Sequence, residues 1–393
     1  MTNRRFCIRR ACLVIFPAIL MLYAFGGALQ FLGLLSQTTS NLFIAANLLF
    51  FIAFEKALRI NIAELFLLLS LALLLALGVV NGSGATAIAV YAYYFSCLGL
   101  SLYSAKLFAN HPPFDINRAF LIIRIILMIQ IPVLVLQIVY ADAIAAASRV
   151  PLIPLDVASG TFFLKSDSSL AFTALLAACA AYLLKIRNRQ SMLVISITIA
   201  FLTSSKASQA TAVAVFIFLN WHELVLSRKF GRVVTLLAGA ACSSVILIVY
   251  FYFLKEIGDG VLAELEHAYE NRFAHETASR FAVLGEALFG DPNLFGRGLL
   301  TYHNPIDRSW LYYSGHSLFY SLFIDLGIIG VAVFIVGICV FTGKSIQSKL
   351  FIFIFLFVFF IFSFFNFSLS DISFLFPYFL FIYLAKKGNH AGS

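Results

Sequence analysis

The sequence predicts an all-α polytopic membrane protein that forms a single integral membrane domain over residues 1–393. The chain is 62% hydrophobic and only 11% charged, with a mean hydropathy of +0.97, whereas soluble domains are about a quarter charged. Its long apolar runs, such as 62–80 and 350–365, lack the alternation that a transmembrane β-barrel needs. A bundle of helices remains, because helices satisfy their own backbone hydrogen bonds in lipid.

Hydropathy divides the chain into about twelve spans of the length that crosses a bilayer. They fall at 11–35, 40–55, 62–80, 85–105, 119–140, 168–184, 190–203, 207–225, 233–254, 316–342, 349–366 and 371–385. The first run follows four arginines but is longer than the apolar core of a signal peptide, so we expect it to be retained. The runs 190–203 and 207–225 are short, and we expect them to be tilted or half-crossing.

Lysine and arginine set the orientation, because they accumulate in cytoplasmic connections. With the N-terminus inside, two thirds of the 27 basic residues fall on the cytoplasmic side. They are Arg4, Arg5, Arg9, Arg10, Lys56, Arg59, Lys106, Arg118, Lys185, Arg187, Arg189, Arg228, Lys229, Arg232, Lys344, Lys349, Lys386 and Lys387. The pattern therefore predicts an inner-membrane-type protein with both termini in the cytoplasm. The net charge of +9 follows from this topology and does not indicate a nucleic-acid partner.

The basic residues left outside are the unusual ones, and they fall on three connections. The first connection is 140–167, with Arg149, and the second is the tight turn around Lys206. The third is a large periplasmic loop, 255–315, inserted between spans and rich in charge. Charges beside a bilayer mark functional positions, and loops carry function. The large loop is therefore the predicted location of chemistry or recognition.

Two arginines of the large loop are candidates for binding an anion. Arg280 offers planar, permanently charged donors that suit phosphate, although an ion pair with Glu276 one turn earlier is the alternative. Arg297 lies between Gly296 and Gly298 in Phe-Gly-Arg-Gly-Leu. Glycines on both sides allow a close backbone approach to a ligand, and a plain turn is the alternative.

Three further residues are candidates for polar chemistry near the membrane. His316 begins an apolar run, where a neutral imidazole can exchange a proton with a substrate oxygen; an interfacial histidine is the alternative. His303 is a weaker candidate, because it lies in a turn. Asp325 lies inside a span and is expected to face the bundle interior, with Arg124 as a candidate partner.

Several classes of site are missing from the sequence. No Walker motif, dinucleotide turn, HExxH motif or acidic pair is present. The six cysteines lie in apolar runs or near the N-terminus, and they show neither disulfide nor metal spacing. We therefore expect no metal and no cofactor. A periplasmic site also lacks ATP, so its substrate must arrive already activated, as a lipid-pyrophosphate sugar does.

Three ordered segments resemble the O-antigen polymerase and O-antigen ligase superfamily of bacterial membrane glycosyltransferases. Residues 202–208, Leu-Thr-Ser-Ser-Lys-Ala-Ser, are similar to its T-x-S-R turn, with Lys206 where arginine is usual. Ser-Arg at 279–280 with the Gly-Arg-Gly at 296–298 is similar to its R…W…G-x-G segment, with no tryptophan between Arg280 and Gly296. Gly-His-Ser-Leu at 315–318, followed by Leu-Gly-Ile-Ile-Gly at 326–330, is similar to its H-N/S…G-x-x-G segment. Arg149 and Gly160 also match an R-x10-G spacing of polymerase loops.

The resemblance implies a GT-C-like bundle that acts on an undecaprenyl-pyrophosphate-linked oligosaccharide without a metal. It implies that Arg280 and His316 are catalytic, and that Arg149, Lys206 and Arg297 hold the pyrophosphate. Besides the bilayer, a chain-length regulator and a flippase are candidate partners. We favour a polymerase of O-antigen, capsule or exopolysaccharide repeat units. An O-antigen ligase that transfers the glycan to lipid A core is one alternative, and a lipid-linked oligosaccharide flippase or other transporter is the non-enzyme alternative.

Overall fold

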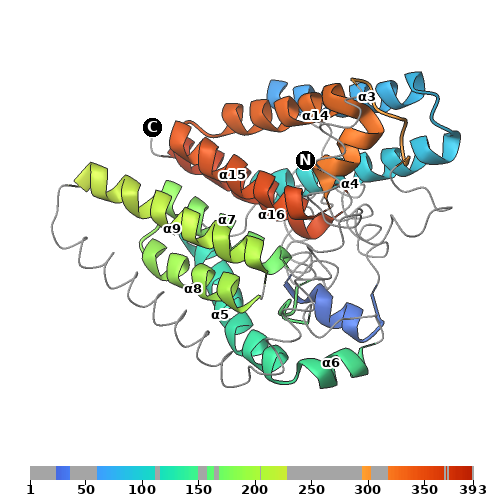
Figure 1. Ribbon diagram of the computed structural model, residues 1–393. Coiled ribbons are helices and arrows are strands. Elements are labelled where there is room, and N and C mark those ends of the chain that lie inside the picture. Colours follow the sequence, from blue (N-terminus) through green and yellow to red (C-terminus); the bar gives the residue numbers. More distant parts are fainter. Residues whose placement is uncertain are drawn as a thin grey trace, which may run out of the picture.

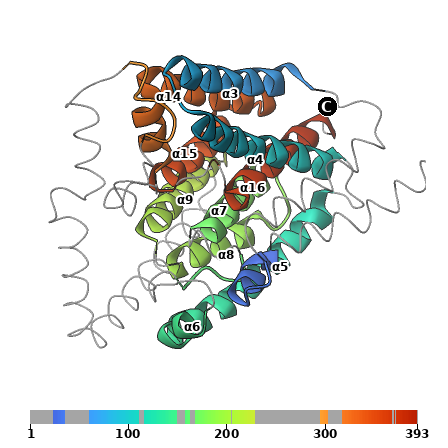
Figure 2. The same ribbon diagram turned by 90° about the vertical axis from the view of Figure 1, so that its right-hand side faces the viewer.

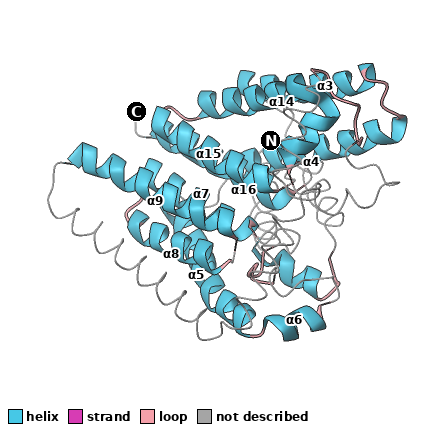
Figure 3. Cartoon of the chain, in the orientation of Figure 1, coloured by secondary structure: helices cyan, strands magenta, loops and turns pink. Residues whose placement is uncertain are grey.

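A computed structural model describes ten stretches of the chain. They are residues 24–35, 60–110, 116–148, 157–162, 168–203, 205–227, 294–301, 317–366, 369 and 371–391. The predicted spans 40–55 and 233–254 lie outside the described residues, as does most of the loop 255–315. The described elements are helices joined by turns and loops, with no strand among them (Figure 3).

The helices coincide closely with the predicted spans that fall on described residues. They are α3 Ile62–Val80, α4 Ala85–Asn110, α5 Ile116–Val139, α6 Ala141–Ala147, α7 Ser169–Leu183, α8 Arg189–Leu202, α9 Lys206–Ser227, α14 Leu318–Ser345, α15 Lys349–Phe365 and α16 Ile372–Ala391. Residues 24–31 are helical as well. Four of these helices, α3, α4, α5 and α14, are long and apolar enough to cross a membrane. Four shorter apolar helices lie at 169–183, 189–202, 207–220 and 349–364.

One helix was not expected from the sequence. The short α6 begins the connection 140–167, which was predicted to be a loop. Its sequence, Ala-Asp-Ala-Ile-Ala-Ala-Ala, is rich in the strongest helix former. Asp142 lies in its first turn, where a negative charge is favourable to the helix dipole. Local propensity is therefore sufficient to explain it.

The helices stack in an ordered series, which the two ribbon views show (Figures 1 and 2). Helix α14 packs along α3 at one edge, α4 pairs with α16, and α16 packs on α7. Helices α7, α8 and α9 pack on one another, and α5 lies against α8 at the far edge. Helix α15 connects the two halves through α14, α7 and α9. Every side chain of α7 from Ser169 to Tyr182 is buried, so α7 is the central helix of the described bundle.

The outer helices present apolar side chains away from the bundle. On α3, Leu69 and Leu73 are about half exposed, whereas Leu67 and Leu74 are buried. On α5, Leu136 is also more than half exposed. A helix that is apolar all round, with one side unpacked, fits a lipid environment better than water.

Hydrogen bonds group the helix ends into two sets, which define two ends of the bundle. At the first, called the Asn81 end, the α3–α4 turn binds the segment 294–301 near the start of α14. At the other, called the Asn61 end, the start of α3 meets the end of α4 and the last turns of α16. Helix α3 therefore runs from the Asn61 end to the Asn81 end, whereas α4 runs back to the Asn61 end.

Candidate functional site

A break in α14 forms the centre of the Asn81 end. Gly327 has φ 70° and ψ −167°, which is not helical, so the helical hydrogen-bond ladder is interrupted there. The carbonyl oxygens of Ile324 and Asp325 accept hydrogen bonds from two consecutive N–H groups of the segment 294–301, at 2.9 and 3.0 Å. The N–H of Ile329 donates to a carbonyl of the same segment at 3.2 Å. The segment thus supplies backbone partners that the broken helix lacks, as irregular backbone within a membrane protein must.

The side chain of Asp325 reinforces this junction. It is 1% exposed, and its Oδ2 accepts hydrogen bonds from the Tyr91 hydroxyl at 2.5 Å and from the Leu300 N–H at 3.0 Å. The sequence correctly placed this carboxylate in the bundle interior. The suggested partner was wrong, because Arg124 binds the Ser191 hydroxyl at 3.3 Å. Tyr91 gave no signal in the sequence, since a tyrosine in an apolar run is an ordinary packing residue.

The α3–α4 turn holds the opposite side of the segment 294–301. The side-chain amide of Asn81 donates to the Phe295 carbonyl, and the Leu299 N–H donates to Ser83 Oγ at 2.7 Å. A Cβ on Gly78 would lie 2.3 Å from the Leu299 side chain, so the absence of a side chain lets α3 approach the segment. The segment is therefore fixed between two helices.

Two glycines let the segment adopt this path. Gly296 and Gly298 have φ +82° and +103°, in the region that favours glycine. A Cβ on Gly296 would lie 2.3 Å from the Asp325 carbonyl oxygen. The glycines therefore permit a close backbone approach, as the sequence indicated, but the partner is α14. Arg297 between them has an exposed side chain.

Lys206, the other described candidate cation, is the first residue of α9. In the turn before it, the hydroxyls of Ser168 and Ser205 lie 3.4 Å apart, which joins the starts of α7 and α9. Helix α9 packs on α7, α8 and α15, whereas the segment that carries Arg297 packs on α3, α4 and α14. Lys206 and Arg297 are thus carried by different groups of helices in the described part of the chain. Arg149, Arg280, His303 and His316 lie outside the described residues.

Gly160, the glycine of the R-x10-G spacing, lies in a buried turn. Its N–H and carbonyl are both bound by the Gln137 amide, at 2.7 and 2.8 Å. The next N–H, of Thr161, donates to Gln130 Oε1 at 2.8 Å. Gln130 and Gln137 are seven residues apart on α5 and so share one face. Sequence reasoning missed both, although two amides two turns apart in an apolar span were a usable signal.

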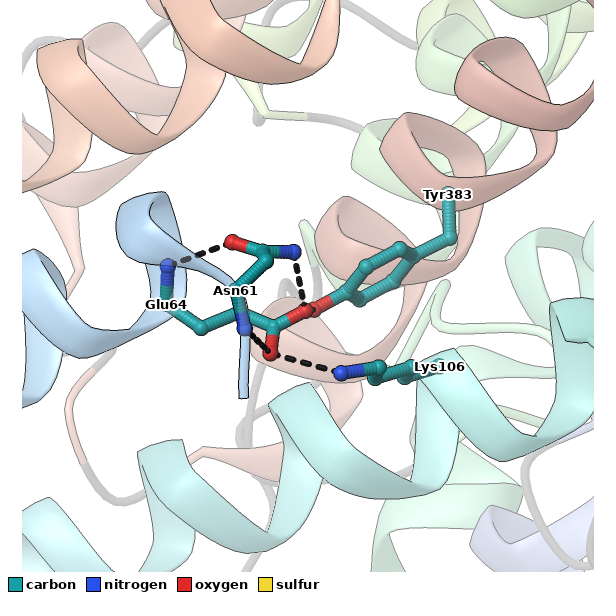
Figure 4. Close-up of polar contacts among 4 residues, drawn as sticks. All are labelled: Asn61, Glu64, Lys106 and Tyr383. Atoms are coloured by element: carbon teal, nitrogen blue, oxygen red, sulfur yellow. Dashed lines mark hydrogen bonds and ion pairs between the residues drawn. The ribbon is translucent and has the colours of Figure 1, made fainter. Parts of the chain in front are cut away.

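A second polar cluster lies at the Asn61 end and was also missed (Figure 4). Glu64 is fully buried, and its carboxylate accepts from Lys106 Nζ at 2.6 Å and from the Tyr383 hydroxyl at 2.7 Å. Asn61 closes the cluster as N-cap of α3, because its side chain accepts from the Glu64 N–H and its own N–H donates back to Glu64. This is a capping box. The cluster connects α3, α4 and α16.

The two sites differ in what they can do chemically. The Glu64 carboxylate is surrounded by donors and holds helices together, while the Asn81 end displays an arginine beside a helix break. Within the stretches that the structure describes, no group of three His, Cys, Asp or Glu residues could hold a metal ion. The Asn81 end is therefore the better candidate for function.

Comparison with known proteins adds no family to this description. No protein-family model, curated protein or solved structure matches the chain. The class defined by the fold is a helical protein with several helices suited to a membrane.

Proposed function

We propose that this chain is a multi-pass glycosyltransferase of the bacterial inner membrane. It polymerises glycan repeat units carried on undecaprenyl pyrophosphate, for O-antigen, capsule or exopolysaccharide. In this proposal the Asn81 end faces the periplasm, and both termini are cytoplasmic. The motifs at Lys206, Arg280, Arg297 and His316 give the proposal its chemistry.

The observation that carries the proposal is the way Arg297 is presented. The N–H groups of Arg297 and Gly298 donate to carbonyls of α14, and the Leu294 carbonyl accepts from the Ile329 N–H, while the Arg297 side chain is exposed. A guanidinium on a fixed backbone is pre-organised to bind phosphate oxygens. A mobile loop would lose part of that binding free energy to ordering. Arg297 lies beside α14, and His316 comes just before that helix in the sequence. This location suits a substrate whose lipid stays in the bilayer.

The reaction needs charge stabilisation rather than a cofactor. A hydroxyl of the acceptor glycan attacks the anomeric carbon of the donor, and the bond from that carbon to the pyrophosphate oxygen breaks. Undecaprenyl pyrophosphate leaves with the electron pair, and cations such as Arg280, Arg297, Arg149 and Lys206 offset the charge that develops on it. His316 orients the attacking hydroxyl and accepts its proton.

A deletion strain complemented with variants tests the proposal. We expect Arg297→Ala, Arg280→Ala and His316→Ala each to collapse the ladder of glycan lengths on a gel to a single repeat unit. Lys344→Met, an exposed cation on the C-terminal turn of α14, is the matched control and should leave the ladder intact. Unchanged ladders in all three site variants would refute the assignment. Intact free polymer with no attachment to lipid A core would instead indicate a ligase.

The break in α14 favours one second candidate, a transporter of lipid-linked oligosaccharide. Transporters place binding sites at discontinuous helices near the middle of the membrane. In proteoliposomes, a transporter would move labelled lipid-linked repeat unit across the bilayer without forming a glycosidic bond. A polymerase would lengthen the glycan without net translocation.

A further inference from the structure

We propose that Asp325 is a positioning residue, which acts with Tyr91 to lock the segment 294–301 into the break of α14 and so fixes Arg297. The inference rests on the proposed function, in which Arg297 binds the pyrophosphate. Asp325 itself does not contact the substrate in this proposal.

Asp325 accepts hydrogen bonds from the segment 294–301 at two atoms. Its main-chain carbonyl accepts from the Gly298 N–H at 3.0 Å, and its side-chain Oδ2 accepts from the Leu300 N–H at 3.0 Å. One residue thus binds the backbone on the C-terminal side of Arg297 twice within three residues. On the other side of the same arginine, Gly296 packs directly on the Asp325 backbone.

Tyr91 holds the carboxylate itself. Its side chain is 1% exposed and donates to the same Oδ2 that receives the Leu300 N–H. Its ring is confined by edge contacts with Tyr94 and Phe95, at 5.6 and 5.8 Å between centroids. Because Tyr91 lies on α4, the Asp325–Tyr91 pair, called the lock, connects three parts of the chain: α4, α14 and the segment 294–301.

A carboxylate is unexpected at this position unless it has a role. Asp325 is buried within a helix suited to a membrane, where ionisable residues are rare and costly. The Leu300 N–H and the Tyr91 hydroxyl are neutral hydrogen-bond donors, so an apolar side chain in place of Asp325 would leave both without this acceptor. Asp325 lies eight residues after Ser317, which is roughly 12 Å along a helix axis. The lock therefore sets the geometry between Arg297 and the beginning of α14, next to His316.

Hydrogen exchange on the purified full-length chain in nanodiscs tests the lock directly. The four consecutive N–H groups from Arg297 to Leu300 all donate to described partners in the wild-type protein. We expect Asp325→Asn to speed their exchange by about tenfold or more, because a hydrogen bond to a charged group is worth more than one to a neutral group. Tyr91→Phe, which deletes one hydroxyl and no ring, should act in the same direction. Tyr383→Phe is the matched control, because it removes the equivalent tyrosine–carboxylate bond at the Asn61 end and should leave exchange at 297–300 unchanged.

A turnover assay with a synthetic lipid-pyrophosphate repeat unit then tests positioning. If Asp325 acts through Arg297, Asp325→Asn lowers kcat/KM by about tenfold, and the double variant with Arg297→Ala is no worse than Arg297→Ala alone. Unchanged exchange at 297–300 in both lock variants overturns the inference, and so does faster exchange with wild-type turnover. Effects that multiply in the double variant overturn it too. Failure of the proposed function gives a different result, because the wild-type protein would then show no turnover, or Arg297→Ala would leave it unchanged, whereas the exchange experiment does not depend on turnover.

Discussion

Replacing Lys106 with methionine removes the cation from the Glu64 cluster and keeps a side chain of similar length. In the wild-type protein Lys106 Nζ lies 2.6 Å from Glu64 Oε2, and the lysine side chain is 17% exposed. The Glu64 side chain is fully buried. The substitution therefore leaves a carboxylate in the bundle interior without its positive partner.

The expected loss of stability is about 3 kcal/mol, because removing one member of a buried ion pair is strongly destabilising, about 3–5 kcal/mol. The lower end applies here, since Tyr383 and Asn61 still donate to the carboxylate. Removing both charges together should be much milder, because a neutral Gln still accepts from Tyr383 and no charge is stranded. The double variant Glu64→Gln/Lys106→Met should thus recover about 2 kcal/mol relative to Lys106→Met.

Thermal stability in detergent measures the effect, as the fraction of monodisperse protein that survives heating. Lys106→Met should lower the apparent Tm by roughly 5 °C or more. The exposed Lys344→Met is the control and should shift it by less than about 1 °C. The reasoning fails if Lys106→Met and Lys344→Met lower the apparent Tm equally, or if the double variant Glu64→Gln/Lys106→Met is less stable than Lys106→Met.

Three further substitutions probe the packing of the chain. Gly296→Ala places a Cβ 2.3 Å from the Asp325 carbonyl oxygen and should cost about 2 kcal/mol or more in apparent stability, whereas Gly84→Ala, which meets nothing within 4 Å, should be neutral. Gln137→Ala removes two hydrogen bonds from the buried Gly160 turn and should cost about 1–3 kcal/mol of stability, which lowers the apparent Tm. A Tm equal to that of the wild-type protein would contradict the assignment. Leu69→Asp, on the exposed side of α3, should reduce the membrane-integrated fraction after carbonate extraction, since a central aspartate costs about 2.5–3.5 kcal/mol on insertion, and Leu69→Phe should not.

Much of the helical framework could be predicted from hydropathy. The apolar run 62–80 coincides with α3 at both ends, because Asn61 caps its start and the Asn-Gly-Ser-Gly turn follows it. The ends of α8 and α9 were also predicted, since the polar turn 203–206 interrupts two apolar runs. Among the described helices, only α6 was missed, where alanine propensity acted without a long apolar pattern.

The polar sites were predicted less well, and for a physical reason. Asp325 could be assigned to the interior because a charge in lipid must find a partner, but its partner Tyr91 is 234 residues away in sequence. Glu64 should have been noticed by the same rule. In the sequence, its partner Lys106 looked like a cation of a connecting loop, and Tyr383 looked like an ordinary aromatic residue of an apolar span. Only helix packing brings both residues to Glu64.

By itself, the sequence determined the described apolar helices and the positions of the charges that lipid would not tolerate alone. Those properties depend on transfer free energy and local backbone preference, which neighbouring residues decide. The tertiary structure alone decided that Gly327 breaks α14, that the Gly-Arg-Gly segment fills the break, and that Asp325 and Tyr91 close it. Such contacts join residues far apart in the chain, and no periodicity in the sequence encodes which helix faces which.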